Sequence, residues 1–316
     1  MNGPRMQVEY LSNARGIEPE WWDLWQRDPA ATPFQSPAWL VPWRRHFRDG
    51  ESVILSMREE GRLLALLPLF AREGRFLPWG AGPTDRLDGV FDPHLEPDSL
   101  SDALGRLSLP VEFFQLRSDS PLTHAHAPEG WRAETSPAES CAVLSLPARP
   151  SKKMAQNLRY CRRRAARAGI SGPERSGATE IEALADLHTR RWRLRGEAGI
   201  FADARMLGWL REAFPALETA NLLRLHTMRA GAETVAALCV LTAKQRSYYY
   251  IGGFAPEYAR LGLGTVLVGH AIEEAGREGH ESFDFLRGRE AYKYRWGAAD
   301  QPTRARRLAP PLRRSA

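Results

Sequence analysis

Residues 248–267 read YYYIGGFAPEYARLGLGTVL. The aromatic and β-branched start of this stretch is typical of a strand, and the stretch ends in a helical pattern that begins at Gly264-Thr265. Glycines at the start of a helix let backbone N–H groups approach an anion closely, and the helix dipole adds partial positive charge at the same place. The stretch therefore predicts a strand, a glycine loop and a helix that together hold an anionic ligand, with a plain structural turn as the alternative.

We expect the contacts of this anion site to come from the two glycine pairs, from one arginine that reinforces a pyrophosphate contact, and from the first residue of the helix. These residues are Gly252, Gly253, Arg260, Gly262, Gly264 and Thr265.

The segments around this stretch alternate between helix and strand patterns. Amphipathic helices are expected at Ile181–Trp192 and Ala204–Phe214, and strands at Leu222–Arg229 and Thr234–Thr242, which a turn at residues 230–233 joins into a hairpin. After the glycine loop we expect a helix, a strand and a short helix, at Thr265–Glu278, Ser282–Leu286 and Glu290–Trp296.

A basic helix is expected at Ser151–Arg167, which carries seven basic residues and no acid. Its apolar residues recur every three or four positions and predict one buried stripe: Met154, Leu158, Cys161, Ala165 and Ala168. The cationic remainder indicates either a solvated basic face, which we favour, or a surface for nucleic acid such as tRNA.

The first half of the chain has its own pattern of helices and a hairpin. Two helices, Glu18–Gln26 and Pro37–Phe47, carry tryptophans at helical spacing, and the strands Ser52–Met57 and Leu63–Phe70 meet at a turn with Gly61. The polar segment Asp119–Glu139 follows. We expect a domain junction after it, which divides the chain into residues 1–149 and 150–316.

Composition limits the class of protein. With 316 residues, 43% hydrophobic, 26% charged and a net charge of +6, the chain is long enough for two globular domains. No apolar run approaches the roughly 20 residues of a membrane span, and the start lacks the pattern of a secretory signal, so we expect a cytoplasmic protein.

No metal site is expected from the sequence. The three cysteines, Cys141, Cys161 and Cys239, are far apart, and His124 and His126 have no third ligand near them in sequence. His270 lies within the helix after the glycine loop and is expected at the surface or in the core.

Residues 283–297 read FDFLRGREAYKYRWG. On a strand, Phe283 and Phe285 face one layer and Asp284 faces the other, so this acid is either paired or functional. The structural alternative pairs Asp284 with Arg287 or Lys293 and leaves Tyr292 to pack the last helix.

The order of elements resembles the GNAT acyltransferase superfamily, whose glycine loop takes the pyrophosphate of acyl-CoA. The usual loop begins with Arg or Gln, but Ala259 stands there and Arg260 is one residue late, so binding should rest more on backbone N–H groups. Residues 283–297, the stretch FQSPAWL at residues 34–40 and the basic helix at 152–167 resemble the CelD-like family, a distant relative of the FemAB peptidyltransferases. The resemblance implies an α/β (α+β) fold with two tandem GNAT-like domains, each a mixed sheet flanked by helices.

The same resemblance implies an N-acyltransferase that uses acetyl-CoA or another acyl-CoA as cosubstrate. The acceptor is a small-molecule or saccharide amine, with a link to polysaccharide or cell-envelope biosynthesis. Asp284 or Glu290 takes the amine proton, Tyr292 donates to the leaving thiolate and Lys293 orients the acceptor. The alternatives are a non-catalytic GNAT-like accessory protein and a FemAB-like transferase that uses aminoacyl-tRNA.

Overall fold

The computed structural model describes residues 6–311 and divides the chain into two compact units. The first unit takes the described residues of Met1–Glu139 and Pro302–Ala316, and the second takes Ser140–Gln301. This division differs from the expected boundary at 149/150, because it falls within a long strand, β7 (Arg132–Ser145). The end of the chain belongs to the first unit again, because β13 (Ala299–Ala309) pairs with β6 (Val111–Arg117).

The first unit is a mixed sheet with helices, in the order β1-β2-β3-β4-β6-β13. Strands β4 and β6 are parallel, and the other pairs are antiparallel. Its remaining elements are β1 (Met6–Leu11), α1 (Glu18–Arg27), the 3-10 helix η1 (Pro33–Gln35), α2 (Pro37–His46), β2 (Ser52–Glu59), β3 (Arg62–Arg72), β4 (Arg75–Pro78), β5 (Val90–Phe91), α3 (Ser99–Gly105) and α4 (Pro121–His124).

The predicted helices and hairpin of this unit are confirmed. The two helices begin at the expected residues, and Gly61 in the β2–β3 turn has a φ of +81°, which favours glycine. The tryptophans at helical spacing, Trp21, Trp39 and Trp43, are at most 2% exposed. They form core, as their spacing indicates.

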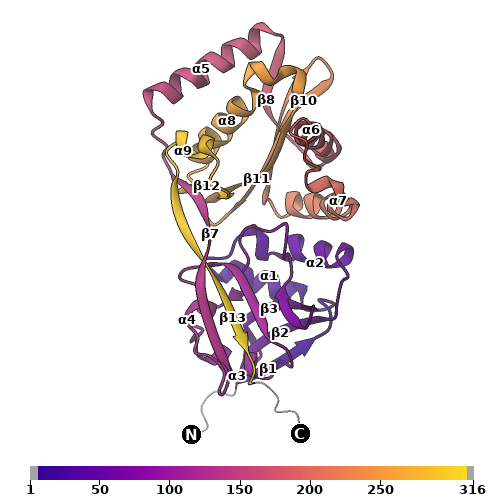
Figure 1. Cartoon of the computed structure of the whole chain (residues 1–316), viewed down its shortest axis with the longest axis vertical. Coiled ribbons are helices and arrows are strands. Elements are labelled where there is room, and N and C mark those ends of the chain that lie inside the picture. The colour runs from indigo at the N-terminus through magenta and orange to yellow at the C-terminus, as the bar shows by residue number, and fades with distance from the viewer. Residues whose placement is uncertain (1–5, 312–316) are drawn as a thin grey trace. The chain divides into compact units, whose positions relative to one another are not determined.

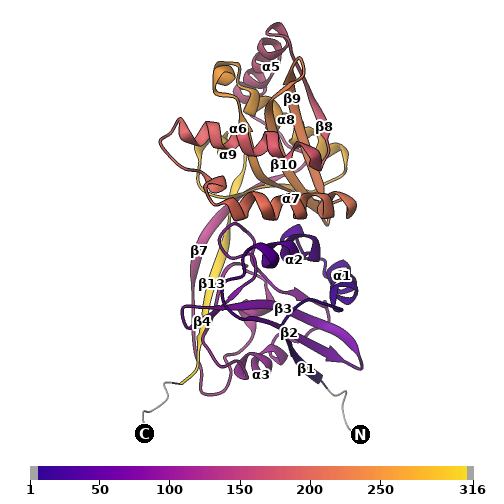
Figure 2. The same cartoon turned by 90° about the vertical axis from the view of Figure 1, so that its right-hand side faces the viewer.

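The second unit is also a mixed sheet, in the order β7-β12-β11-β10-β9-β8, in which only β11 and β12 are parallel among the described pairs. Helices α6 and α7 cover one face and α5 and α8 the other (Figures 1 and 2). Its elements besides β7 are α5 (Lys152–Arg167), β8 (Ile170–Ser176), η2 (Ala178–Glu180), α6 (Ile181–Arg193), η3 (Ile200–Ala202), α7 (Ala204–Thr219), β9 (Leu223–Ala230), β10 (Glu233–Ala243), β11 (Arg246–Phe254), η4 (Pro256–Leu261), α8 (Leu263–Arg277), β12 (Ser282–Arg287) and α9 (Ala291–Arg295).

The mixed α/β class is confirmed, and the predicted strands and helices around the glycine loop are present. The polar segment Asp119–Glu139 is not simply a connection, because β7 begins within it at Arg132 and continues beyond it to Ser145. Strand β7 is exposed over its first half, so its residues do not alternate between apolar and polar, and sequence periodicity missed it. Sequence periodicity missed the largely exposed strands β8 and β13 for the same reason.

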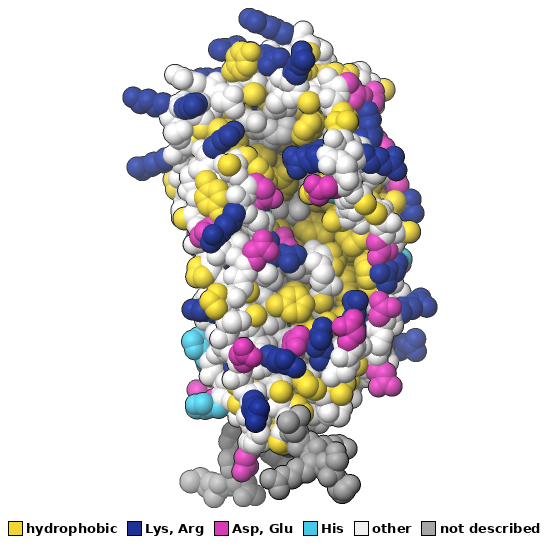
Figure 3. Space-filling view, in the orientation of Figure 1, with side chains coloured by type: hydrophobic (Ala, Val, Ile, Leu, Met, Phe, Trp, Pro, Cys, Tyr) yellow, Lys and Arg dark blue, Asp and Glu magenta, His cyan; other side chains and the backbone are white. Residues whose placement is uncertain are grey.

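Helix α5 buries the expected stripe except at its end. Met154, Leu158, Cys161 and Ala165 are buried, whereas Ala168 is the exposed C-cap residue. The stripe packs on α8, where a Cβ added at Gly269 would lie 2.7 Å from a methyl of Leu158. Lys and Arg side chains project from the surface at the place where Figure 1 draws α5 (Figure 3).

We expect Leu158→Asp to lower the free energy of unfolding by about 2–4 kcal/mol, because a carboxylate would be forced against α8 without a partner. Urea unfolding of the full chain measures this loss. Arg163→Ala, at an exposed position of the same helix, is the control and should change stability by less than about 0.5 kcal/mol. Equal stability of the two variants would show that the stripe does not support the fold.

Within residues 6–311, none of the helices has the length and the apolar character that crossing a membrane requires.

Candidate functional site

The site begins where two parallel strands separate. Strands β11 and β12 pair at three positions, the last of which joins Tyr248 to Asp284. Beyond these positions β11 continues to Phe254 and β12 to Arg287. On its other edge, β11 shifts register with β10 so that Tyr250 is an extra residue, and such a bulge bends a strand. The last part of each strand is therefore not paired with the other.

A cleft of about 300 Å³ occupies this region of the second unit. Its walls come from β10, β11 and α8, with α5, α6 and α9 closing its sides, and most of the lining is apolar or glycine. A concave, mostly apolar cleft with a few convergent polar groups is typical of a small-molecule site. The polar side chains that line it belong to Asn157, Arg191, Tyr249, Thr265, Tyr292 and Arg295.

The N-terminus of α8 opens onto this cleft. Leu263 and Gly264 are the first residues of the helix, so their N–H groups have no acceptor within it. A Cβ added at Gly264 would meet only Phe254, at 3.8 Å, so packing does not require a glycine at this position. The absent side chain leaves space in the cleft beside free helical donors. This arrangement fits a pyrophosphate.

Gly262, in contrast, is required by the fold. Its φ is +74°, and an added Cβ would lie 2.6 Å from the sulfur of Cys161 on α5. Gly253 is equally constrained, because an added Cβ would lie 2.4 Å from the backbone nitrogen of His188 on α6. The glycines of the stretch therefore have two separate purposes, close packing of helices and an open cleft.

Five of the six residues predicted to bind the anion line the cleft: Gly252, Gly253, Gly262, Gly264 and Thr265. Arg260 does not line the cleft. It is exposed on η4, and its neighbour Ala259 lines the cleft instead. The arginine is one residue away from the usual place, as the sequence indicated. If an anion binds at this end, the groups that remain to contact it are backbone N–H groups.

Two tyrosines and an arginine form the polar centre of the cleft. Tyr249 shares hydrogen bonds with Tyr292 and with Arg191. Burial raises the pKa of Tyr249, against the opposing effect of Arg191. Burial, Tyr249 and Glu290 raise the pKa of Tyr292 far above its usual value. Both phenols are therefore protonated near neutral pH and can donate hydrogen bonds.

The ring of Phe285 packs against this pair, with ring centroids 6.3 Å from Tyr249 and 6.2 Å from Tyr292. The Phe283 ring lies 5.1 Å from that of Phe285, so the two phenylalanines share a face of β12 as expected.

Asp284 is buried outside the set of residues that line the cleft. Its Oδ1 accepts a hydrogen bond of 2.7 Å from the backbone N–H of Leu286. Leu286 has a φ of +60°, uncommon for a leucine, and the pairing of β12 with β7 is interrupted between Asp284 and Arg287. The carboxylate holds an irregular turn at the end of β12.

Lys293 also lies outside the cleft lining, and its side chain is 3% exposed. It donates to the carbonyls of Leu286 at 3.3 Å, of Gly288 at 3.1 Å and of Arg287. It also lies 2.9 Å from Oε2 of Glu290, whose side chain is 58% exposed. Lys293 therefore fastens the turn after β12 to α9, which carries Tyr292.

Arg191, Tyr249 and Asn157 also line the cleft, although no sequence pattern marked them as site residues. Arg191 and Asn157 lie on helices whose patterns predicted only an apolar stripe. Tyr249 is the middle of three consecutive tyrosines, and strand alternation separates it from Tyr248, which is buried. That alternation was the one signal that could have identified it.

Residues 152–294 match the family model described as an acetyltransferase (GNAT) domain. The match lies within the second unit and includes the strand, glycine loop and helix that frame the cleft. None of the curated proteins compared with the chain matches its sequence.

Several solved structures share the fold over nearly the whole chain. FemX has a TM-score of 0.65 at 10% identity, with 94% of this chain and 96% of FemX covered. The C-terminal domain (DUF2156) of a protein from Agrobacterium fabrum, described as a lysylphosphatidylglycerol synthetase, has a TM-score of 0.59 at 14% identity, covering 94% and 98%. A tandem GNAT protein from the clavulanic acid biosynthesis pathway has a TM-score of 0.50 at 14% identity, covering 98% and 100%. At these identities the likeness concerns the fold alone.

Proposed function

We propose, from the match of residues 152–294 to a GNAT domain, that this chain transfers an acyl group from acyl-CoA to an amine acceptor in the cleft beside β11 and α8. The observation that carries the proposal is that the α8 N-terminus, with its open Gly264, and the glycine-rich end of β11 line one cleft. A helix N-terminus suits a pyrophosphate, and the apolar walls suit an extended thioester arm.

Acyl-CoA supplies the activated carbonyl, and this chain supplies the positions of proton donors and acceptors. When an amine forms the new C–N bond and the C–S bond breaks, the amine loses a proton and the thiolate needs one. We assign Tyr292 as the donor for the thiolate, because its side chain lines the cleft beside Tyr249. Tyr249 hydrogen-bonds to that hydroxyl, and Arg191 hydrogen-bonds to Tyr249 in turn.

Of the two carboxylates expected to take the amine proton, we favour Glu290. No carboxylate lines the cleft in the described part of the chain, but Glu290 is exposed and lies close enough to act on the pKa of Tyr292. It can receive the proton through water. Asp284 acts instead through the turn it holds, and Lys293 positions the same turn and does not touch the acceptor.

The finer assignment rests on sequence. The stretches at residues 34–40, 152–167 and 283–297 that resemble the CelD-like family support a saccharide or other envelope-related amine as acceptor. Acetyl-CoA is the acyl donor we test first. Release of free thiol in the presence of a panel of amines identifies an acceptor, and binding without thiol release from any of them supports the non-catalytic accessory reading.

Gly264→Val should weaken acetyl-CoA binding by at least about tenfold, because the added side chain fills the space beside the helical donors. Isothermal titration of the full chain measures the dissociation constant. The matched control is Gly276→Val in the same helix, where an added Cβ meets nothing within 4 Å, and it should bind as the parent does. Equal binding by both variants would place the cosubstrate elsewhere. Gly262→Val is unsuitable, because it would strain the fold.

A further inference from the structure

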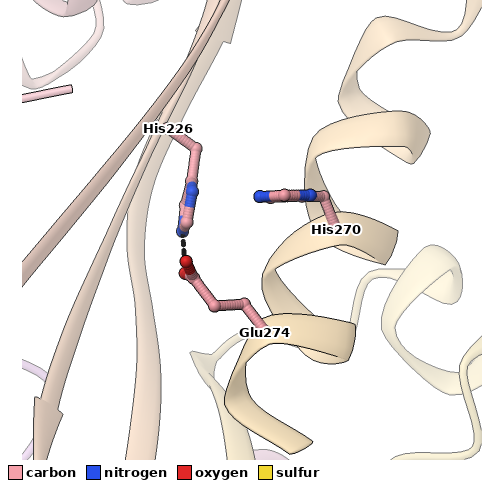
Figure 4. A group of neighbouring side chains, drawn as sticks. All are labelled: His226, His270 and Glu274. Atoms are coloured by element: carbon pink, nitrogen blue, oxygen red, sulfur yellow. Dashed lines mark ion pairs between the residues drawn. The ribbon is translucent and has the colours of Figure 1, made fainter. Parts of the chain in front are cut away.

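A cluster of two histidines and a glutamate lies between β9 and α8, outside the cleft lining. His226 projects from β9, and His270 and Glu274 project toward it from successive turns of α8 (Figure 4). One potential ligand atom from each residue lies within 4.8 Å of the other two. Residues four apart share a helix face, so the two α8 side chains reach the same point.

We propose that His226, His270 and Glu274 bind one zinc ion, which ties strand β9 to helix α8. Two imidazoles and a carboxylate are a known zinc ligand set that leaves a fourth position for water. This inference does not depend on the proposed acyltransferase function. It also revises the expectation of a metal-free chain, which rested on ligand spacing in the sequence.

The geometry of the cluster is close to what zinc requires. Nε2 of His226 lies 3.2 Å from Oε2 of Glu274, and ligand atoms at about 2.0–2.1 Å from a tetrahedral zinc lie about 3.3 Å apart. The His226 and His270 rings are 5.1 Å apart between centroids and nearly perpendicular, at 78°. A ligand nitrogen of His270 lies within 4.8 Å of the ligand atoms of the other two residues, so zinc binding would require His270 to move somewhat closer to them.

His226 is not fully accounted for by hydrogen bonds within the protein. Its side chain is 1% exposed, yet its Nδ1 has no hydrogen-bond partner in the described residues. The other nitrogen, Nε2, faces Glu274 and is the one that a shared zinc ion would contact.

The arginines around the cluster pair with other carboxylates, which leaves Glu274 available to bind a metal ion. Arg162 pairs with Glu273 at 2.6 Å, and Arg224 pairs with Glu278 at 3.0 Å. These arginines are therefore neutralised by carboxylates other than Glu274, whose side chain is 18% exposed. That partial exposure also provides a path by which an ion can enter from solvent.

The test is zinc titration of the full chain after removal of metal with a chelator, using a competing chromophoric chelator to measure affinity. We expect one zinc per chain, and His270→Ala and Glu274→Gln should each weaken binding by at least about 100-fold, since even outer partners of metal ligands affect affinity 10–100-fold. Zinc should raise the melting temperature of the parent but not of either variant.

Glu273→Gln is the matched control, because it removes the neighbouring exposed carboxylate of α8, and it should keep the affinity of the parent. His270→Ala and Glu274→Gln change partly exposed positions, so both variants should fold without metal. Parent-like affinity in these two variants, an equal loss in Glu273→Gln, or less than one zinc per chain would overturn the site and leave His226–Glu274 as an ordinary ion pair.

Discussion

Tyr292→Phe is expected to lower turnover by about 10²–10⁴-fold, the usual contribution of a positioned proton donor. The ring remains packed between Tyr249 and Phe285, so only the hydroxyl is lost and the fold should be unchanged. Affinity for acetyl-CoA should stay within about threefold of the parent, because an interaction made during the reaction affects turnover rather than ground-state binding. Steady-state kinetics with the acceptor found in the amine panel, beside titration of acetyl-CoA, separates the two quantities.

Tyr294→Phe provides the matched control for this variant. Tyr294 lies on the same short helix, but its hydroxyl donates to Asp300 at 2.6 Å and does not line the cleft. It should keep parent-like turnover. If Tyr292→Phe is equally active, the hydroxyl has no part in protonating the thiolate, and the tyrosine only packs α9.

Lys293→Met should destabilise the second unit by about 2–4 kcal/mol, because it removes the donor of several carbonyls and one partner of an ion pair. Methionine keeps the length and apolar stem of the side chain, so little volume is lost. The carbonyls of Leu286, Arg287 and Gly288 would lose the ammonium that donates hydrogen bonds to all three. Urea unfolding measures the loss, and turnover should fall only as far as the turn that carries α9 loosens.

Lys153→Met makes the same chemical change at an exposed position of α5, and it should alter stability by less than about 0.5 kcal/mol. An outcome in which Lys293→Met keeps parent stability but loses turnover would restore the role expected from the sequence, in which Lys293 orients the acceptor.

Local pattern determined much of the second unit. The order of strand, glycine loop and helix at residues 248–267 predicted the N-terminus of α8 at the cleft, because glycine position and hydrophobic period are properties of neighbouring residues. The alternation of Phe283, Asp284 and Phe285 likewise predicted which side chains share a face of β12. The chemical roles of Asp284, Glu290, Tyr292 and Lys293 stay predictions that the variants above test.

Tertiary structure decided which distant residues meet. Periodicity indicates which face of an element is buried but not which element covers that face. It therefore could not predict that Arg191 of α6 lies beside Tyr249, or that His226 of β9 lies beside His270. The exposed strands β7 and β13 have no apolar alternation to detect, and they form because strands of the sheets satisfy their backbone groups. The sequence also did not show which groups surround Lys293, so it resembled a substrate-binding lysine. In the fold its ammonium contacts the carbonyls of its own turn.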